Sequence, residues 1–487
     1  MEEINTSKKI IGKELYGYQQ DALEEIFKRF EDAPQDYHLL YQLPTGGGKT
    51  VIFSEIVRRY IETFKKKVLV LTHRIELSKQ TSKMLNEFGV KNKIINSTAV
   101  LDDQDNFSCF VAMVETLKNR LNDEKVDISD IGLVIVDEAH YNSFTKIFKF
   151  FDDAFILGVT ATPLSSNTKL PMYGNYQELF VGESIQHLIE SDYLASANLY
   201  SYNVGLTSLE VGANGDYTVK SSEDLYTNTD MLSKLVSAYE ETAKGKKTLI
   251  FNNGINTSIQ VFHAFKKAGY PIAHLDNTNT KKEREFILKW FHKTPNAVLT
   301  SVSILTTGFD EPSIEAIILN RATKSLTLYY QMIGRGSRIY GDKNTFEVVD
   351  LGNNFHRFGA WGADLDWQKM FRSPDYYLDA ILSDEDIEST FRYELPADVK
   401  TEFAKSKDTY FDMKKVYSED VFDALILAKM LGDEIDDRIN RYAKCISKST
   451  HNFVTWLKDD YRKKLNAHLR TNFDEIFEDI FGHPPED

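Results

Sequence analysis

Short apolar runs alternate with amphipathic stretches from about residue 15 to residue 352. Polar residues do not recur at every second position of the apolar runs, so both faces of the strands that they predict are expected to be buried. These strands are expected at 38–43, 68–72, 109–114, 133–136 and 155–159 in the first half, and at 248–251, 272–275, 297–300, 316–319 and 346–350 in the second. The intervening stretches predict helices, among them 50–59, 76–88, 257–267, 281–291 and 326–333. The alternation predicts an α/β fold with parallel sheets that helices cover on both faces.

The alternation occurs in two blocks and weakens between and after them. Residues 203–230 are rich in Gly, Ser, Thr and Asn without clear periodicity, so we expect a loop-rich insertion there. After about residue 370 the strand pattern fades, and 421–431 and 453–469 have the periodicity of helices. We expect an α/β domain over residues 1–195, a second over 196–370, and a small, mostly α accessory domain over 371–487.

Composition and charge narrow the functional classes. A hydrophobic content of 42% and a charged content of 27% are typical of an ordinary globular protein. The N-terminal residues MEEINTSKK carry no apolar segment behind their charges, and no window of about eighteen apolar residues follows, so we expect a cytoplasmic protein without a membrane partner. Cys109 and Cys445 alone predict neither a zinc site nor a disulfide. The net charge of −15 is acidic for a nucleic-acid partner, but it leaves room for a basic groove between domains.

A glycine-rich loop lies between the first expected strand and the first expected helix. It reads LPTGGGKT over residues 43–50. Glycines let the backbone curl so that its N–H groups point at phosphate oxygens, Lys49 adds a charge for the β and γ phosphates, and Thr50 offers a hydroxyl to Mg²⁺. The strict consensus has a glycine where Leu43 stands. The candidate nucleotide-binding residues of the loop are Thr45, Gly46, Gly47, Gly48, Lys49 and Thr50.

An acidic pair lies at the end of another apolar run, in the string VDEAH at 136–140. Ligands collect at the carboxyl ends of strands in open α/β sheets. Asp137 can hold Mg²⁺, and Glu138 can orient and deprotonate an attacking water. Together with the glycine-rich loop upstream, the pair predicts hydrolysis of ATP with Mg²⁺ as cofactor.

Further strings accompany these two motifs in order: LTHRIELSKQ at 71–80, VETL at 114–117, TATP at 160–163, TLIFNNG at 248–254, TTGFDEP at 306–312 and QMIGRGSR at 331–338. With them the chain resembles superfamily 2 helicases and translocases of the DEAD/DEAH-box type. The resemblance covers residues 15 to about 360 and implies two tandem RecA-like domains with ATP bound between them. THRIEL in place of PTREL, and DLGNNFHRFG at 350–359, favour the group related to excision-repair helicases and restriction-enzyme motor subunits.

The resemblance also implies roles for single residues. Gln19 would read the adenine, and Gly308 and Asp310 would face the nucleotide. Arg74, Thr116 and Thr307 would contact the nucleic-acid backbone.

QMIGRGSR is the most specific of these strings. We expect it to place Gln331, Arg335 and Arg338 on one face of a single helix, at i, i+4 and i+7. Two guanidinium groups aimed across a cleft would neutralise the charge that builds on the γ phosphate. An arginine finger of this kind contributes roughly 10³–10⁵ in rate.

Several alternatives stay open at this stage. The chain is expected to act on DNA in preference to RNA, but an RNA helicase, the motor subunit of a larger restriction or defence complex, and a non-catalytic ATP-gated clamp are the competing hypotheses. The basic stretch at 441–470 interleaves aromatic residues with Lys and Arg, which suits either a nucleic-acid contact or an amphipathic helix. The C-terminal domain could also dock a protein partner.

Overall fold

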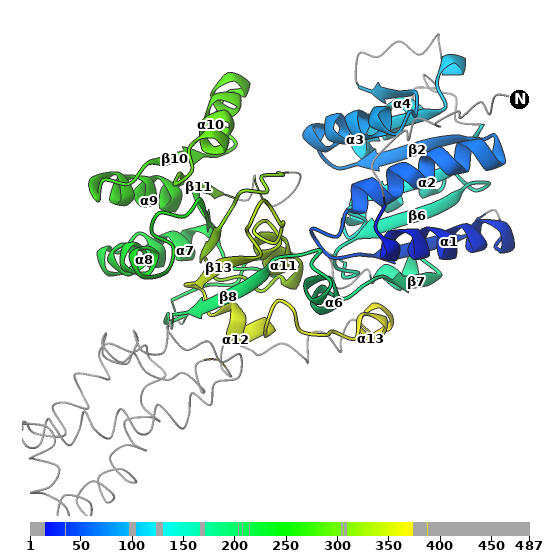
Figure 1. The fold of residues 1–487 in the computed structure, drawn as a ribbon. Coiled ribbons are helices and arrows are strands. Elements are labelled where there is room, and N and C mark those ends of the chain that lie inside the picture. Colours follow the sequence, from blue (N-terminus) through cyan, green and yellow to red (C-terminus); the bar gives the residue numbers. More distant parts are fainter. Residues whose placement is uncertain are drawn as a thin grey trace, which may run out of the picture.

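The computed structural model describes residues 15–34, 36–96, 104–122, 130–165, 171–202, 204–206, 208–213, 215–302, 305, 309–373 and 387. These residues form two lobes that lie side by side, each built around a parallel sheet with helices on both faces (Figure 1). We call the lobe that contains the seven-stranded sheet the first lobe, and the lobe that contains the six-stranded sheet the second lobe. The α/β architecture with two RecA-like sheets is therefore confirmed.

The first sheet has the strand order β3-β4-β2-β5-β6-β1-β7, and its neighbouring strands are all parallel. Its strands are β1 (His38–Gln42), β2 (Lys67–Thr72), β3 (Asn92–Ile95), β4 (Cys109–Met113), β5 (Ile131–Asp137), β6 (Phe155–Thr160) and β7 (Glu178–Val181). Every residue of β5 and β6 is buried, which explains their uninterrupted apolar pattern. Because the strands are parallel, the loops that follow β1, β2, β4 and β5 open at the same edge of the sheet.

Helices cover both faces of the first sheet. They are α1 (Gly17–Asp32), α2 (Lys49–Phe64), α3 (Ile75–Glu87), α4 (Val114–Asn122), α5 (Thr145–Phe148) and α6 (Ile185–Glu190), with short 3₁₀ turns at Gln104–Asn106, Asn142–Phe144 and Met172–Gly174. Helices α1, α2, α3 and α6 bury their apolar residues on one face, and α4 and α5 bury theirs on the other.

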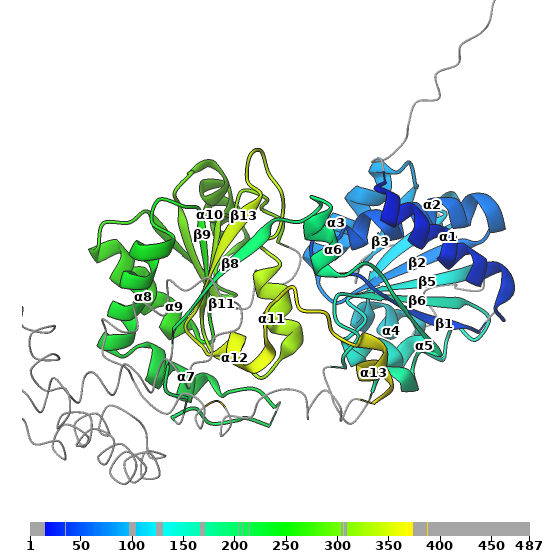
Figure 2. The ribbon, with the colours of Figure 1, turned by 60° about the horizontal axis from the view of Figure 1, so that its bottom comes forward.

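The second sheet has the order β10-β11-β9-β12-β13-β8 and is also parallel (Figure 2). Its strands are β8 (Ser196–Ser201), β9 (Thr248–Asn252), β10 (Ile272–Leu275), β11 (Val298–Val302), β12 (Ala316–Asn320) and β13 (Thr345–Asp350). Its helices are α7 (Val219–Tyr226), α8 (Thr229–Thr242), α9 (Ile255–Lys267), α10 (Lys281–Lys293), α11 (Leu326–Ile333) and α12 (Asn354–Phe358). Helices α7, α8 and α9 cover one face, and α10 and α11 cover the other.

The chain returns to the first lobe after α12. Helix α13 (Trp367–Arg372) packs beside β7, where the amide nitrogen of Gln368 donates a hydrogen bond to the carbonyl of Leu179 at 2.7 Å. Phe371 joins the buried apolar cluster of the first lobe. The expected boundary at 370/371 thus falls inside a helix that contacts the first lobe, and the division into domains stays a prediction.

Some expected elements differ from the structure. The sequence pattern did not predict β3, β7 and β8, in which most residues are only partly buried. The prediction of a loop-rich insertion at 203–230 is partly wrong, because helix α7 occupies Val219–Tyr226, with Thr218 as its N-cap. Cys109 is buried and free. The helices expected at 421–431 and 453–469, the basic stretch at 441–470 and Cys445 lie outside the described residues. Among the helices that the structure does describe, none has the length and apolarity needed to cross a bilayer.

Candidate active site

The glycine-rich loop turns from the end of β1 into the start of α2, which begins at Lys49. Gly46 and Gly48 have φ angles of 95° and 83°, in the left-handed region that favours glycine. A Cβ on Gly48 would lie 2.5 Å from Nε2 of Gln19, so this position has no room for a side chain. The first-turn N–H groups of α2 therefore face the concave side of the loop, where an anion is stabilised.

Lys49 is held under the loop by its own backbone. Its Nζ donates a hydrogen bond to the carbonyl of Leu43 at 3.4 Å, and the Leu43 side chain is fully buried below. Leucine in place of the consensus glycine at position 43 thus adds apolar packing, and its carbonyl still accepts the hydrogen bond of Lys49. Burial lowers the pKa of Lys49, although the carboxylates of Glu138 and Asp137 act in the opposite direction. A phosphate would add negative charge beside this partly buried ammonium, next to the two carboxylates.

The acidic pair follows β5 and lies beside Lys49. Glu138 has a φ of 53°, an uncommon value for a residue other than glycine that marks a constrained backbone. Burial and the neighbouring Glu138 carboxylate raise the pKa of Asp137 to about 7. Burial alone would raise the pKa of Glu138, but Lys49, His140 and Arg335 together lower it. Glu138 is therefore the carboxylate of the pair that stays ionised and can accept a proton.

A chain of polar contacts leads from Glu138 into the second lobe. His140 places Nδ1 3.4 Å from Oε2 of Glu138 and 3.1 Å from Oγ1 of Thr160. The Thr160 hydroxyl donates to the carbonyl of Thr162 at 2.9 Å. The Thr162 hydroxyl in turn donates to Oγ1 of Thr327, on the first turn of α11, at 2.8 Å. The TATP string thus reaches Glu138 through His140 and contacts the second lobe directly.

The prediction that QMIGRGSR forms one helix is wrong. Helix α11 ends at Ile333, and residues 334–336 form a turn. A Cβ on Gly334 would lie 2.6 Å from Cβ of Thr45, so the turn packs directly on the glycine-rich loop of the first lobe. Glycine at 334 and 336 leaves room for close approach, because an added Cβ would clash with Thr45 at the first position and with Phe346 at the second.

Both arginines of the string nevertheless reach the lobe interface. Arg338 donates from Nη1 to the carbonyl of Gly46 at 3.3 Å, and its Nη2 lies 3.3 Å from Oδ1 of Asp310. Arg335 donates to the carbonyl of Phe309 at 2.7 Å. Burial and the Arg338 charge lower the pKa of Arg335 to about 10, which leaves it cationic at neutral pH. Arg338 therefore contacts the phosphate loop, and Arg335 is near enough to Glu138 to help lower the pKa of that carboxyl.

Among the buried polar atoms of the site without a hydrogen-bond partner among the described residues are Nε2 of Gln331 and Oε2 of Glu138, and both side chains are less than a tenth exposed. Unpaired buried polar atoms are costly and rare in native proteins. A phosphate oxygen and a water bound between the lobes would satisfy them, so the side chains present fit a nucleoside triphosphate.

The donor set for a divalent cation is small. Asp137 is a buried carboxylate and Thr50 carries a hydroxyl on the first turn of α2. No group of three or more His, Cys, Asp or Glu residues gathers as a metal site within the described part of the chain. Mg²⁺ is usually held by one or two protein ligands together with phosphates and waters, so these two residues fit it.

The Gln19 amide joins the start of α1 to the glycine-rich loop. Its Oε1 accepts from the backbone N–H of Tyr16, and its Nε2 donates to the carbonyl of Gly47, both at 3.1 Å. The sequence did not predict the ring contacts of Tyr193. The centroid of its ring lies 4.6 Å from that of Tyr16 and 5.1 Å from that of Tyr18. No local pattern could have paired residues this far apart. Adenine reading by Gln19 stays a prediction.

The predicted nucleic-acid contacts lie at the same edge of the first sheet. Arg74 follows β2 as the N-cap of α3, and Thr116 lies near the start of α4, which follows the neighbouring strand β4. Across from them, Arg284 of α10 forms an ion pair with Glu76 of α3 at 3.2 Å. The remaining predicted residues, Thr307 and Gly308, lie outside the described residues.

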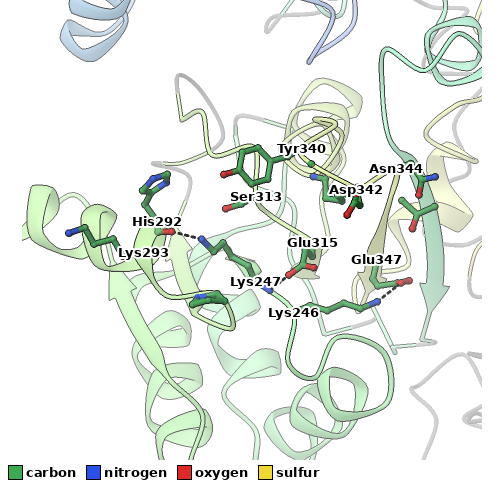
Figure 3. Close-up of a pocket in the computed structure, with 14 residues that line it drawn as sticks. Lys246, Lys247, His292, Lys293, Ser313, Glu315, Tyr340, Asp342, Asn344 and Glu347 are labelled. Carbon is green, nitrogen blue, oxygen red and sulfur yellow. Dashed lines mark hydrogen bonds and ion pairs between the residues drawn. The ribbon is translucent and has the colours of Figure 1, made fainter.

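A separate cavity of about 690 Å³ opens on the second lobe near the amino ends of β9, β12 and β13 (Figure 3). Three of its four lysines already have partners: Lys246 pairs with Glu347, Lys247 donates to the carbonyl of His292 at 2.7 Å, and Lys343 donates to three backbone carbonyls.

Comparison with known proteins agrees with this geometry. Residues 12–165 match the family model described as "Type III restriction enzyme, res subunit", and residues 228–340 match the helicase conserved C-terminal domain. A 51.5 kDa protein of Lactococcus phage (isolate 7-9) is 30% identical over 336 residues, which cover 68% of this chain and 69% of the phage protein. The ATP-dependent DNA helicase uvsW of Enterobacteria phage T4 is 22% identical over 353 residues, which cover 69% of this chain and 68% of that protein.

A solved structure shows the same fold. The ATP-dependent Type ISP restriction-modification enzyme LlaBIII, bound to DNA, superposes with a TM-score of 0.55 at 16% identity, covering 88% of this chain and 34% of that chain. This chain thus spans about a third of the length of that enzyme. The chain belongs to the superfamily 2 helicases, in the group related to restriction-enzyme motor subunits, and is an ATP-dependent helicase or translocase of nucleic acid.

Proposed function

We propose that the chain is a DNA-stimulated ATPase that moves along DNA, with ATP hydrolysed between the two lobes. The observation that carries this proposal is the contact of Arg338 with the carbonyl of Gly46, which sets a second-lobe guanidinium against the phosphate loop of the first. An element from each lobe can then bind the same triphosphate.

In the proposed reaction, the loop N–H groups and Lys49 bind the β and γ phosphates. Thr50 and Asp137 would hold Mg²⁺, which would screen the phosphate charge when bound. Gln331 orients a water, and Glu138 accepts its proton as the water oxygen bonds to the γ phosphorus and the bridging P–O bond breaks. Arg335 and Arg338 stabilise the charge on the phosphate oxygens.

Movement follows from the difference between the two nucleotide states. ATP favours closed lobes because both contact it, and loss of the γ phosphate removes that preference. The polar chain from Glu138 through Thr162 to Thr327 is suited to link hydrolysis to lobe closure. Contacts from Arg74 and Thr116 to the backbone would read phosphates rather than bases, so we expect weak sequence preference and a strong salt dependence.

DNA is the proposed substrate for two reasons. The first lobe matches a restriction-enzyme subunit, and one relative is named as a DNA helicase. An RNA helicase is the competing hypothesis. A restriction or defence complex that uses residues 371–487 as its docking domain is compatible with the same motor.

An ATPase panel tests the proposal. Phosphate release is measured with Mg²⁺ and ATP alone, and then with single- and double-stranded DNA and RNA of matched length and composition. Stimulation by DNA supports the proposal, and stimulation by RNA alone decides for an RNA helicase. Turnover absent under every condition, with ATP still bound, would favour a non-catalytic clamp.

A further inference from the structure

Three aromatic side chains stack between the predicted nucleic-acid edge and the acidic pair. The ring of Tyr141 lies 4.3 Å from that of His73 and 4.3 Å from that of His140, with interplanar angles of 34° and 37°. Tyr141 therefore lies between two imidazoles that come from different loops at the carboxyl edge of the first sheet.

The two ends of this stack lie beside different functional groups. His73 directly precedes Arg74, which caps α3 and is a predicted backbone contact. His140 contacts both Oε2 of Glu138 and Oγ1 of Thr160. The stack thus connects the start of α3 to the carboxylate that would accept the proton.

Packing, and not hydrogen bonding, holds the His73 end. Both ring nitrogens of His73 are buried and have no hydrogen-bond partner among the described residues. Burial lowers the pKa of His73 to about 4, so the ring is neutral at physiological pH. Its contact with Tyr141 is the interaction that can fix its place.

Glu138 is sensitive to small movements of its neighbours. Its backbone has a φ of 53°, and its Oε2 accepts no hydrogen bond among the described residues. The direction of the carboxylate therefore depends on His140 and on the charges around it. A shift of His140 of less than one ångström is enough to change a hydrogen-bond geometry.

We propose that Tyr141 is a positioning residue that couples nucleic-acid binding at the start of α3 to the orientation of Glu138, through the stack His73–Tyr141–His140. A phosphate bound at Arg74 moves the loop that carries His73, the Tyr141 ring follows, and His140 turns Glu138 toward the attacking water. The inference rests on the proposed function, because it explains how nucleic acid stimulates ATP turnover.

The test uses the full chain, four single variants and the double variant that carries both Leu substitutions. Tyr141→Leu and His73→Leu remove a ring, while Tyr141→Phe and His73→Phe keep a ring and remove its polar atoms. For each variant, kcat and KM for ATP are measured without nucleic acid and with the polymer that stimulates the wild type most. Fluorescence anisotropy gives Kd for that polymer, and thermal unfolding checks the fold.

The stimulation factor is the ratio of kcat with the polymer to kcat without it. In the Leu variants this ratio is expected to fall by about fivefold or more. Their KM for ATP and Kd for the polymer are expected to stay within about twofold of the wild type, and the Phe variants to keep the stimulation. The double Leu variant should be no worse than either single, because both changes break one path. Three results would overturn the coupling role while leaving the proposed function intact. They are unchanged stimulation in the Leu variants, an equal fall of basal and stimulated turnover in those variants, and loss of stimulation in the Phe variants. A wild type that no nucleic acid stimulates would overturn the proposed function and this inference together.

Discussion

Arg338 of the second lobe donates a hydrogen bond to the backbone carbonyl of Gly46 in the phosphate loop of the first lobe, with 3.3 Å between the nitrogen and the oxygen. The two residues are 292 positions apart in sequence. The same guanidinium lies 3.3 Å from a carboxylate oxygen of Asp310, so it is held on its own lobe while it reaches across the interface. This geometry makes the lobe interface the place where a triphosphate would be bound from both sides.

Lys49→Ala should reduce ATP turnover to background without unfolding the chain. The side chain is partly buried and desolvation lowers the pKa of its ammonium, so its removal should not lower the unfolding temperature. Phosphate release and thermal unfolding are measured on the same preparation, with the exposed Lys244→Ala as control. Normal turnover in the Lys49 variant would remove this loop from the catalytic site.

Gly46→Ala should lower turnover by about tenfold or more, because the added methyl group displaces the second lobe. Its Cβ would lie 2.7 Å from Oγ of Ser337 and 2.8 Å from Cδ2 of Leu194. Gly245→Ala is the matched control, since Gly245 has a φ of 81° and no atom within 4 Å of the added Cβ. Equal turnover in the two variants would show that the close approach at Gly46 does not exist in solution.

Asp137→Asn should remove a pH dependence of stability. Burial beside Glu138 raises the pKa of Asp137 from 3.8 in the unfolded chain to about 7 in the folded chain. The stability from this group is then fully present below about pH 4 and is lost as the pH rises through about 7. The measurement is made without nucleotide. Because only the wild type loses this stability, the unfolding temperature of Asp137→Asn should rise relative to that of the wild type between about pH 4 and pH 7. The same difference for the exposed Asp152→Asn should stay flat, and a flat difference for Asp137→Asn would contradict the raised pKa.

The ion pair of Arg284 with Glu76 should help to hold the lobes together without nucleotide. Both side chains are partly exposed, so the pair is expected to contribute only about 0–1 kcal/mol and to weaken with salt. Arg284→Glu and Glu76→Arg should each increase the radius of gyration measured by small-angle X-ray scattering at low salt, and the double swap should restore it. A double swap that does not restore the wild-type radius of gyration would show that the pair does not form in solution.

The sequence predicted the elements that have strong local signals. Strand β5 and the glycine-rich loop were expected because a fully buried strand has a continuous apolar pattern and a phosphate loop requires glycine. The strands β3 and β7 were missed because they are short, half-buried edges whose pattern is weak.

The lobe interface was predictable only in part. The end of α11 at Ile333 follows from the contact of Gly334 with Thr45, which no helical periodicity reveals. Arg335 and Arg338 were expected to reach the nucleotide from one helix face, and they lie near the loop from a turn and an extended segment instead. The ring contacts of Tyr193 also join residues that only the tertiary fold brings together.

The most direct measurement of the central claim is single-turnover ATP hydrolysis by Arg338→Ala, alongside equilibrium binding of ATP and with the exposed Arg372→Ala as control. An arginine that acts only on the transferring phosphate contributes roughly 10³–10⁵ in rate, so hydrolysis should slow by about tenfold or more while ATP affinity changes little. Hydrolysis at the wild-type rate in Arg338→Ala would contradict the claim that both lobes act on one nucleotide.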